Sequence, residues 1–111
     1  MTYVKACSLD DLWEGDMSEV EVADHLILLV WPTGGEPRAF QAVCPHQDIP
    51  LAEGKLDGHV IMCRAHQWTF DGTSGHGINP GDCKLAEYPV KVEDDAIFVA
   101  VDGVSPLFAH S

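Results

Sequence analysis

Short runs of apolar residues, some continuous and some alternating with polar residues, recur along the chain between turn-forming residues. Such runs are typical of β-strands, and no long stretch has the periodicity of an amphipathic helix. The expected strands are Val20–Val22, His25–Trp31, Arg38–Val43, Val60–Cys63, Gln67–Phe70, Val90–Val92 and Ile97–Val101. Several short strands at regular spacing predict an all-β fold, a small antiparallel sandwich or barrel.

Turn-forming residues mark the ends of these strands. The expected turns are Ala23-Asp24, Pro32–Gly35, Asp71-Gly72 and Glu93–Asp95. Residues 72–82 contain several glycines and a proline, so we expect them to form a loop. Ser8 followed by Asp11 is a helix-start signal, which predicts a single helical turn over Ser8–Trp13.

The length and charge of the chain limit the functions that it can have. With 111 residues, 46% of them hydrophobic, the chain has one domain with a core of its own. Six basic residues stand against 18 acidic ones, giving a formal net charge of −12. This balance argues against binding to a nucleic-acid backbone or to an anionic membrane surface.

The apolar runs are too short to cross a membrane. The longest are Leu26–Trp31 and Ala96–Val101, far below the roughly 20 residues that a bilayer requires. Met1–Leu9 contains no apolar run of signal-peptide length, so export is not expected. We expect the protein to work in the cytoplasm.

The acidic residues are concentrated in the first third of the chain. Between Lys5 and Arg38 there is no basic residue. The acidic residues in that interval are Asp10, Asp11, Glu14, Asp16, Glu19, Glu21, Asp24 and Glu36. They form either a solvated acidic face or a surface that attracts a basic partner by electrostatic steering.

Four cysteines, at positions 7, 44, 63 and 83, suggest metal binding or catalysis more than disulfide bonds in a cytoplasmic chain. No two of them form a Cys-x-x-Cys motif, which weakens the case for a thioredoxin-like redox pair or a four-cysteine zinc ribbon. Two cysteines have a nearby histidine, in Cys44-Pro45-His46 and in Cys63-Arg64-Ala65-His66. Together these pairs offer two thiolates and two imidazoles.

Two kinds of metal site could use this donor set. One is tetrahedral zinc, and the other is a [2Fe–2S] cluster in which two histidines replace two cysteines on one iron. Zinc modules usually place cysteine near cysteine and histidine near histidine, whereas each loop here is mixed. A mixed loop can give one ligand to each of two inequivalent irons, so the spacing favours the cluster.

The chain resembles the Rieske [2Fe–2S] family. The resemblance rests on Cys44-x-His46, sixteen intervening residues and Cys63-x-x-His66, and extends to Leu51, Gly54, Trp68–Asp71 and Leu85–Val90. It implies that Cys44, His46, Cys63 and His66 bind one [2Fe–2S] cluster. It also implies a Rieske fold over residues 1–111, with a cluster-binding subdomain of two ligand loops, approximately residues 44–83, inserted in a basal β-sandwich or barrel.

A closer resemblance is to the ferredoxin components of bacterial toluene monooxygenases. The matching strings are Cys7–Asp11, Cys44–Gln47, Cys63–His66, Gly75–Pro80 and Ala109–Ser111. The resemblance implies a one-electron carrier, not an enzyme, that takes electrons from an NADH-dependent flavin and iron–sulfur reductase. It delivers them to a di-iron aromatic hydroxylase, and we expect it to be a monomer. A ferredoxin of a ring-hydroxylating dioxygenase and a structural zinc module remain as alternatives.

The chain departs from the family pattern at several positions around the ligands. Arg64 and Gln67 differ from the proline and glycine of many Rieske second loops, whereas Ile49, Ala65, Trp68 and Phe70 differ from the high-potential members. Ile49 and Ala65 stand where high-potential members carry a disulfide, and Trp68 and Phe70 replace hydroxyl donors to the cluster and cysteine sulfurs. Fewer donors destabilise the reduced state, so we expect a midpoint in the lower part of the roughly −150 to +300 mV Rieske range.

The remaining cysteines and histidines have simpler interpretations. Cys7 and Cys83 have no histidine at short spacing, so we expect partly buried free thiols. His25, His59, His76 and His110 are expected to be ordinary polar residues. Trp68 and Phe70 alternate along a predicted strand, which favours core packing.

Overall fold

A computed structural model describes residues 3–44, 49–64, 68–79, 84–101 and 104 of the chain. The strands are β1 (Tyr3–Ser8), β2 (Asp16–Val22), β3 (His25–Trp31), β4 (Arg38–Gln41), β5 (Lys55–Asp57), β6 (Val60–Met62), β7 (Thr69–Asp71), β8 (Gly77–Asn79), β9 (Glu87–Tyr88), β10 (Val90–Glu93) and β11 (Ala96–Ala100). Two short 3-10 turns, η1 (Leu9–Asp11) and η2 (Leu51–Glu53), complete the described elements. In this part of the chain, no helix is long and apolar enough to span a membrane.

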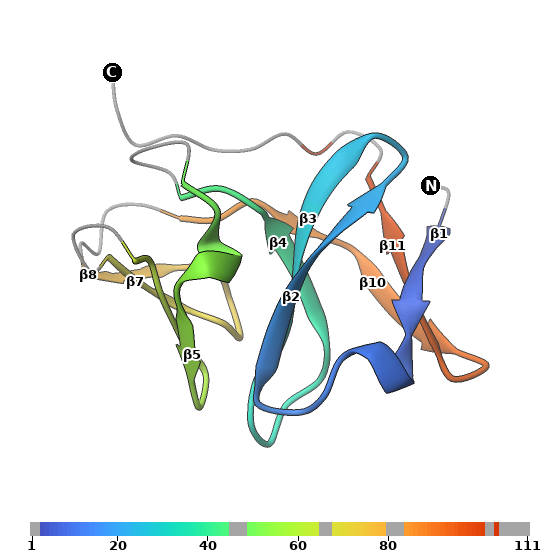
Figure 1. Ribbon diagram of the computed structural model, residues 1–111, viewed down its shortest axis with the longest axis horizontal. Helices are drawn as coiled ribbons and strands as arrows, with labels where there is room; N and C mark the ends of the chain where they lie inside the picture. The colour runs from blue at the N-terminus through green and yellow to red at the C-terminus, as the bar shows by residue number, and fades with distance from the viewer. Residues whose placement is uncertain (1–2, 45–48, 65–67, 80–83, 102–103, 105–111) are drawn as a thin grey trace.

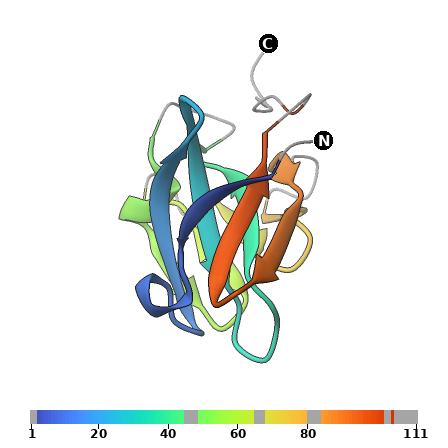
Figure 2. The ribbon, with the colours of Figure 1, turned by 90° about the vertical axis from the view of Figure 1, so that its right-hand side faces the viewer.

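The strands form three antiparallel sheets. Their orders are β1-β11-β10, β2-β3-β4-β9 and β5-β6-β7-β8. Figure 1 shows the β2-β3-β4-β9 sheet in the middle, with β10 and β11 on one side and the β5–β8 sheet on the other. Figure 2 views the molecule from the side of β1, β10 and β11. The predicted all-β antiparallel architecture is confirmed.

Strand β3 divides the interior into two cores because its side chains alternate between the two faces of the central sheet. Ile27 and Leu29 pack in a first core together with residues of β2, β9 and β11. Leu28 and Val30 pack in a second core together with residues of β6 and β7. All four side chains are fully buried, which explains why this strand reads as a continuous apolar run.

Most of the predicted strands are present. The structure places β3 at the predicted residues, and β2, β4, β6, β7, β10 and β11 overlap their predicted ranges. Two hairpin turns are also where the sequence predicts them. Ala23 with Asp24, and Asp94 with Asp95, adopt positive φ angles, as two-residue turns between antiparallel strands require. Leu9–Asp11 forms the predicted helical turn, and the Asp11 carboxylate accepts a hydrogen bond from the Ser8 backbone.

The prediction of a loop throughout residues 72–82 was wrong. Gly77–Asn79 forms β8, which pairs with β7. Strands β1, β5 and β9 were not predicted either. Strand β1 is held by backbone pairing with β11, and β5 and β9 have only three and two residues, so their sequences carry little periodicity.

Candidate metal centre

Cys44 and Cys63 lie just beyond the ends of two strands in different sheets. Cys44 follows β4 of the central sheet, and Cys63 follows β6 of the β5–β8 sheet. Both side chains are fully buried, and both belong to the second core, beside Leu85 and Phe70. Within the described part of the chain, neither cysteine forms a disulfide bond. The fold therefore brings one cysteine of each predicted ligand pair into the same apolar core.

The two cysteines start loops that are closed in the same way. The backbone N–H of Cys44 donates to the carbonyl of Ile49 at 3.0 Å, and that of Cys63 donates to Trp68 at 2.8 Å. Each bond joins a cysteine to the residue five positions later. His46 and His66 fall inside these two closed segments of the sequence, but they lie outside the described residues. In the sequence, each predicted histidine ligand therefore falls between a cysteine and the residue that accepts its N–H.

The first loop is fastened back onto the strand that precedes it. Val43 bridges to Pro50, and the backbone N–H of Leu51 donates to the carbonyl of Ala42 at 2.8 Å. Leu51 begins η2 and is fully buried in the second core. These contacts fix the chain on both sides of Cys44.

Turn η2 also touches the second cysteine segment. Gly54 follows η2 and lies directly against the carbonyl group of Met62. Glu53 accepts a hydrogen bond from Arg64 Nε at 2.6 Å, with both side chains about half exposed. The residue after Cys63 is therefore tied to the element that follows the first loop. Sequence reasoning did not assign Glu53 to the site, and no local sequence signal marks it.

Gln41 is another residue that sequence reasoning missed. It is fully buried, and within the described residues it is the single buried polar side chain. Its Nε2 donates to the carbonyl of Val43 at 2.9 Å, and its Oε1 accepts from the backbone N–H of Ala86 at 2.8 Å. A glutamine within an apolar strand pattern carries no sign of these partners. Its position identifies it as part of the support for Cys44.

The donor set fits an iron–sulfur cluster. The two thiols lie in one apolar core, and each has a histidine two or three residues later in the sequence. Two separate loops therefore supply the sulfur and nitrogen ligands that a cluster with two cysteines and two histidines requires. Within the ranges that the structure describes, no three His, Cys, Asp or Glu side chains group into a metal site. This finding does not bear on His46 and His66, which lie outside those ranges.

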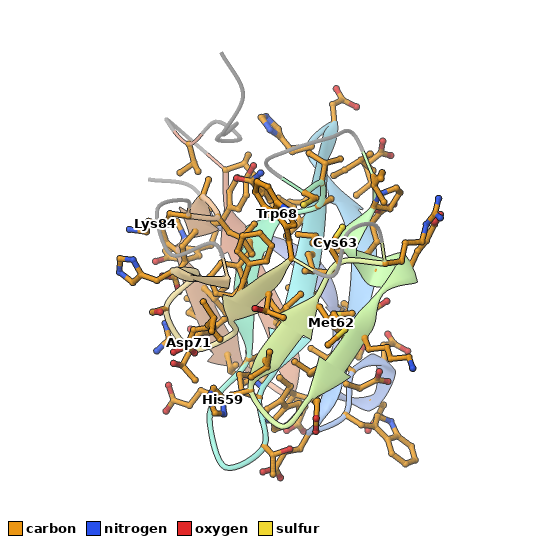
Figure 3. All side chains as sticks on the ribbon, turned by 90° about the vertical axis from the view of Figure 1, so that its left-hand side faces the viewer. His59, Met62, Cys63, Trp68, Asp71 and Lys84 are labelled. Carbon is orange, nitrogen blue, oxygen red and sulfur yellow. The ribbon has the colours of Figure 1, made fainter. Side chains whose placement is uncertain are left out.

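Of the other cysteines and histidines, the structure describes Cys7, His25, His59 and His76. Cys7 is a half-buried free thiol on β1, as predicted, and burial, with a smaller effect of Asp11, raises its pKa. Cys83 and His110 lie outside the described residues. Figure 3 shows His59 at the opposite end of the β5–β8 sheet from Cys63 and Trp68. His76 is exposed, and His25 is partly exposed at the start of β3.

Trp68 and Phe70 have the predicted packing role. Phe70 is fully buried in the second core, and Trp68 is partly buried against it. All eight acidic residues between Lys5 and Arg38 are exposed, as both interpretations of the acidic stretch require. The carboxylates of three of them also accept hydrogen bonds from backbone N–H groups: Asp11 from Ser8, Asp16 from Met17, and Glu14 from Gly34.

Comparison with known proteins identifies the family of this fold and donor set. Residues 2–89 match the family described as the Rieske [2Fe-2S] domain. The chain belongs to this Rieske family. It therefore carries a Rieske-type [2Fe–2S] cluster, and the match favours the cluster over the zinc module that ligand spacing alone left open.

The curated relatives are similar over nearly the whole Rieske chain. It is 42% identical over 107 residues to the "Alkene monooxygenase system, ferredoxin component" of Xanthobacter autotrophicus, covering 95% of this chain and 84% of the relative. It is 35% identical over 106 residues to the "p-cumate 2,3-dioxygenase system, ferredoxin component" of Pseudomonas putida, covering 94% and 89%. These relatives are named as electron-carrying components, and the chain is a Rieske electron carrier, not a catalytic subunit.

Solved structures of Rieske ferredoxins share the fold. The ferredoxin of carbazole 1,9a-dioxygenase from Nocardioides aromaticivorans superposes with a TM-score of 0.80 at 26% identity, covering 90% of this chain and 98% of that one. A ferredoxin in complex with its reduced oxygenase, in carbazole 1,9a-dioxygenase, gives 0.78 at 28% identity, covering 88% and 92%.

Proposed function

We propose that this Rieske protein is the ferredoxin component of a multicomponent monooxygenase. The observation that carries the proposal is the 42% identity to an alkene monooxygenase ferredoxin, spread over 95% of the chain. The dioxygenase ferredoxins are less similar, at 31–36% for those compared. The buried cysteine pair supports the electron-carrier part of the proposal, because it provides a protected site for a redox centre.

We further propose that Cys44, His46, Cys63 and His66 are the cluster ligands. When bound, the cluster accepts and releases one electron at a time. The chain's own residues hold the two thiolates away from solvent and close each loop behind its cysteine. Because both cysteine side chains are fully buried, electron exchange with a partner is proposed to occur on the histidine side.

The proposed partners are an NADH-dependent reductase, which supplies the electron, and a di-iron hydroxylase, which receives it. The chain is proposed to act between them as a cytoplasmic monomer. It is proposed to consist of one domain, in which a cluster-binding subdomain of approximately residues 44–83 is inserted in a basal β domain. The net charge of −12 supports partners that present basic surfaces near their redox centres.

Reconstitution tests this proposal. The purified protein should be red-brown, should bleach with dithionite and should then give an electron paramagnetic resonance signal. Turnover by the reductase and a di-iron hydroxylase should depend on adding it. A matched mixture with a Rieske dioxygenase oxygenase separates the two systems: faster turnover there than with the hydroxylase would assign the chain to a dioxygenase.

A further inference from the structure

Gln41 occupies the point where strand pairing between β4 and β9 ends. Ala39 pairs with Tyr88 and Phe40 with Glu87, and the Gln41 N–H still donates to the carbonyl of Ala86 at 2.9 Å. The hydrogen bond in the opposite direction, from Ala86 to Gln41, does not end on a backbone carbonyl. The Ala86 N–H donates to the side-chain Oε1 of Gln41 at 2.8 Å. The side chain thus takes the place of a backbone acceptor where β4 turns away toward Cys44.

The other end of the same amide holds the chain beside Cys44. Gln41 Nε2 donates to the carbonyl of Val43 at 2.9 Å, and Val43 is the residue immediately before Cys44. One side chain therefore joins the segment that enters the first cysteine loop to the segment at Leu85–Ala86. Leu85 packs in the same core as both cysteines.

Burial makes these bonds costly to lose. Gln41 is fully buried, so the Val43 carbonyl and the Ala86 N–H would each lose a partner if the amide were removed. A side chain needed only for folding stability could be apolar at this place, as its strand neighbours Ala39 and Phe40 are. The amide instead fixes the direction in which the chain leaves β4.

We propose that Gln41 is a positioning residue for Cys44, holding the backbone before that thiolate in one orientation. This inference rests on the proposed ligation of the cluster by Cys44. Removing the amide takes away the tie between the Val43–Cys44 segment and Ala86, while the backbone bonds to residues 49–51 remain. The segment then samples a wider range of orientations, so the cluster is held less tightly and in a less uniform geometry.

The test compares holoproteins of wild type, Gln41→Met and Val99→Ala. Val99 is equally buried but belongs to the first core, so its truncation lowers stability away from the cysteines. Gln41→Met should lose its cluster to an iron chelator at least about fivefold faster, since two buried hydrogen bonds are lost and one net hydrogen bond alone corresponds to about that factor. Its reduced electron paramagnetic resonance signal should broaden, whereas that of Val99→Ala should match wild type.

Further measurements separate the failure of each claim. If Gln41→Met does not fold, Gln41→Asn keeps the amide on a shorter stem that cannot reach both partners, and it should broaden the signal in the same way. A signal unchanged in a folded Gln41 variant, or broadened equally in Val99→Ala, would overturn the positioning role. A Cys44→Ser protein with an unchanged cluster spectrum would instead overturn the proposed ligation.

Discussion

Gly54 lies against the carbonyl oxygen of Met62 so closely that no β-carbon fits between them. A β-carbon at Gly54 would come well inside the 3.0 Å that real β-carbons keep, and it would also crowd the backbone N–H of Arg64 at 3.3 Å. This contact brings the end of η2 against the strand that leads to Cys63. The glycine is required here for close approach, not for an unusual φ angle.

Gly54→Ala should therefore force η2 and β6 apart. Because the atoms in its way are backbone, we expect the free energy of unfolding to fall by about 3 kcal/mol, at the upper end of overpacking effects. Cluster content after purification should fall with it. Urea unfolding and iron content per chain measure both effects. Gly35→Ala is the control, since its β-carbon would make only ordinary contacts with Pro32, and its iron content should equal that of wild type.

The elements that could be predicted from sequence are the strands whose own residues show an apolar pattern. The continuous apolar run of β3 is visible because both faces of that strand are buried. Cys44 and Cys63 could be predicted as ligands because metal-ligand spacing is local in sequence. The order of the sheets was not predictable, since pairing such as that of β1 with β11 joins opposite ends of the chain.

The supports of the site escaped prediction for the same reason. Gln41, Gly54 and Glu53 act through contacts with residues 11 to 45 positions away or through close backbone approach. Strand β8 was missed because Gly77 and its neighbours look like a loop, and its partner β7 supplies the order. Local β-propensity predicts a strand poorly where pairing with a distant strand determines whether the strand forms.

The ion pair between Arg64 and Glu53 places two opposite charges beside Cys63. Arg64→Gln removes a positive charge that favours the reduced site, so the midpoint potential should fall. Glu53→Gln should raise it. Charges about 10 Å apart in water interact by about 0.4 kcal/mol, which corresponds to roughly 20 mV. Potentiometric titration measures these shifts, and the double variant should lie near wild type. Shifts of the same sign in both single variants would contradict this electrostatic account.

The Asp71 carboxylate stabilises the start of the turn between β7 and β8. Burial acts to raise its pKa, but hydrogen bonds to Oδ1 from the Thr73 hydroxyl at 2.6 Å and backbone at 2.8 Å, with His59 and Arg38 nearby, hold the pKa below 3.8. A carboxyl whose pKa is lower in the folded state than in the unfolded state stabilises the fold at pH values above its unfolded-state pKa. This stabilisation is lost as the pH falls through the folded-state pKa.

Asp71→Asn should therefore lower the free energy of unfolding near pH 7 by at most about 1 kcal/mol, since the group is partly exposed and screened. The difference from wild type should shrink below about pH 4. Urea unfolding at several pH values measures it. Asp57→Asn, an exposed position on β5, serves as the control. A difference that stays constant down to pH 2 would count against the role of the ionised carboxylate.

The two ends of the central sheet offer a test of the acidic surface. Ile27 pairs with Gln41, so Glu21, which pairs with Leu26, lies at the end from which the chain continues to Cys44. Glu36 lies at the other end, just before β4. Both side chains are exposed.

Glu21→Lys and Glu36→Lys should slow turnover with the partner proteins at low salt by equal factors if the acids steer at long range. A larger effect of Glu21→Lys would indicate a docking contact at the cysteine end. Steady-state rates across a series of salt concentrations measure this. If neither variant changes the rate or its salt dependence, the acidic stretch is only a solvated face.

Two cysteines and two histidines of this chain are proposed to hold one [2Fe–2S] cluster. The most direct test is pulsed electron paramagnetic resonance of the dithionite-reduced protein with all histidines labelled with ¹⁵N. We expect couplings from two directly bound nitrogens, one lost in His46→Ala, one lost in His66→Ala, and both retained in His59→Ala. A reduced protein without nitrogen couplings, or couplings that survive both ligand substitutions, would contradict it.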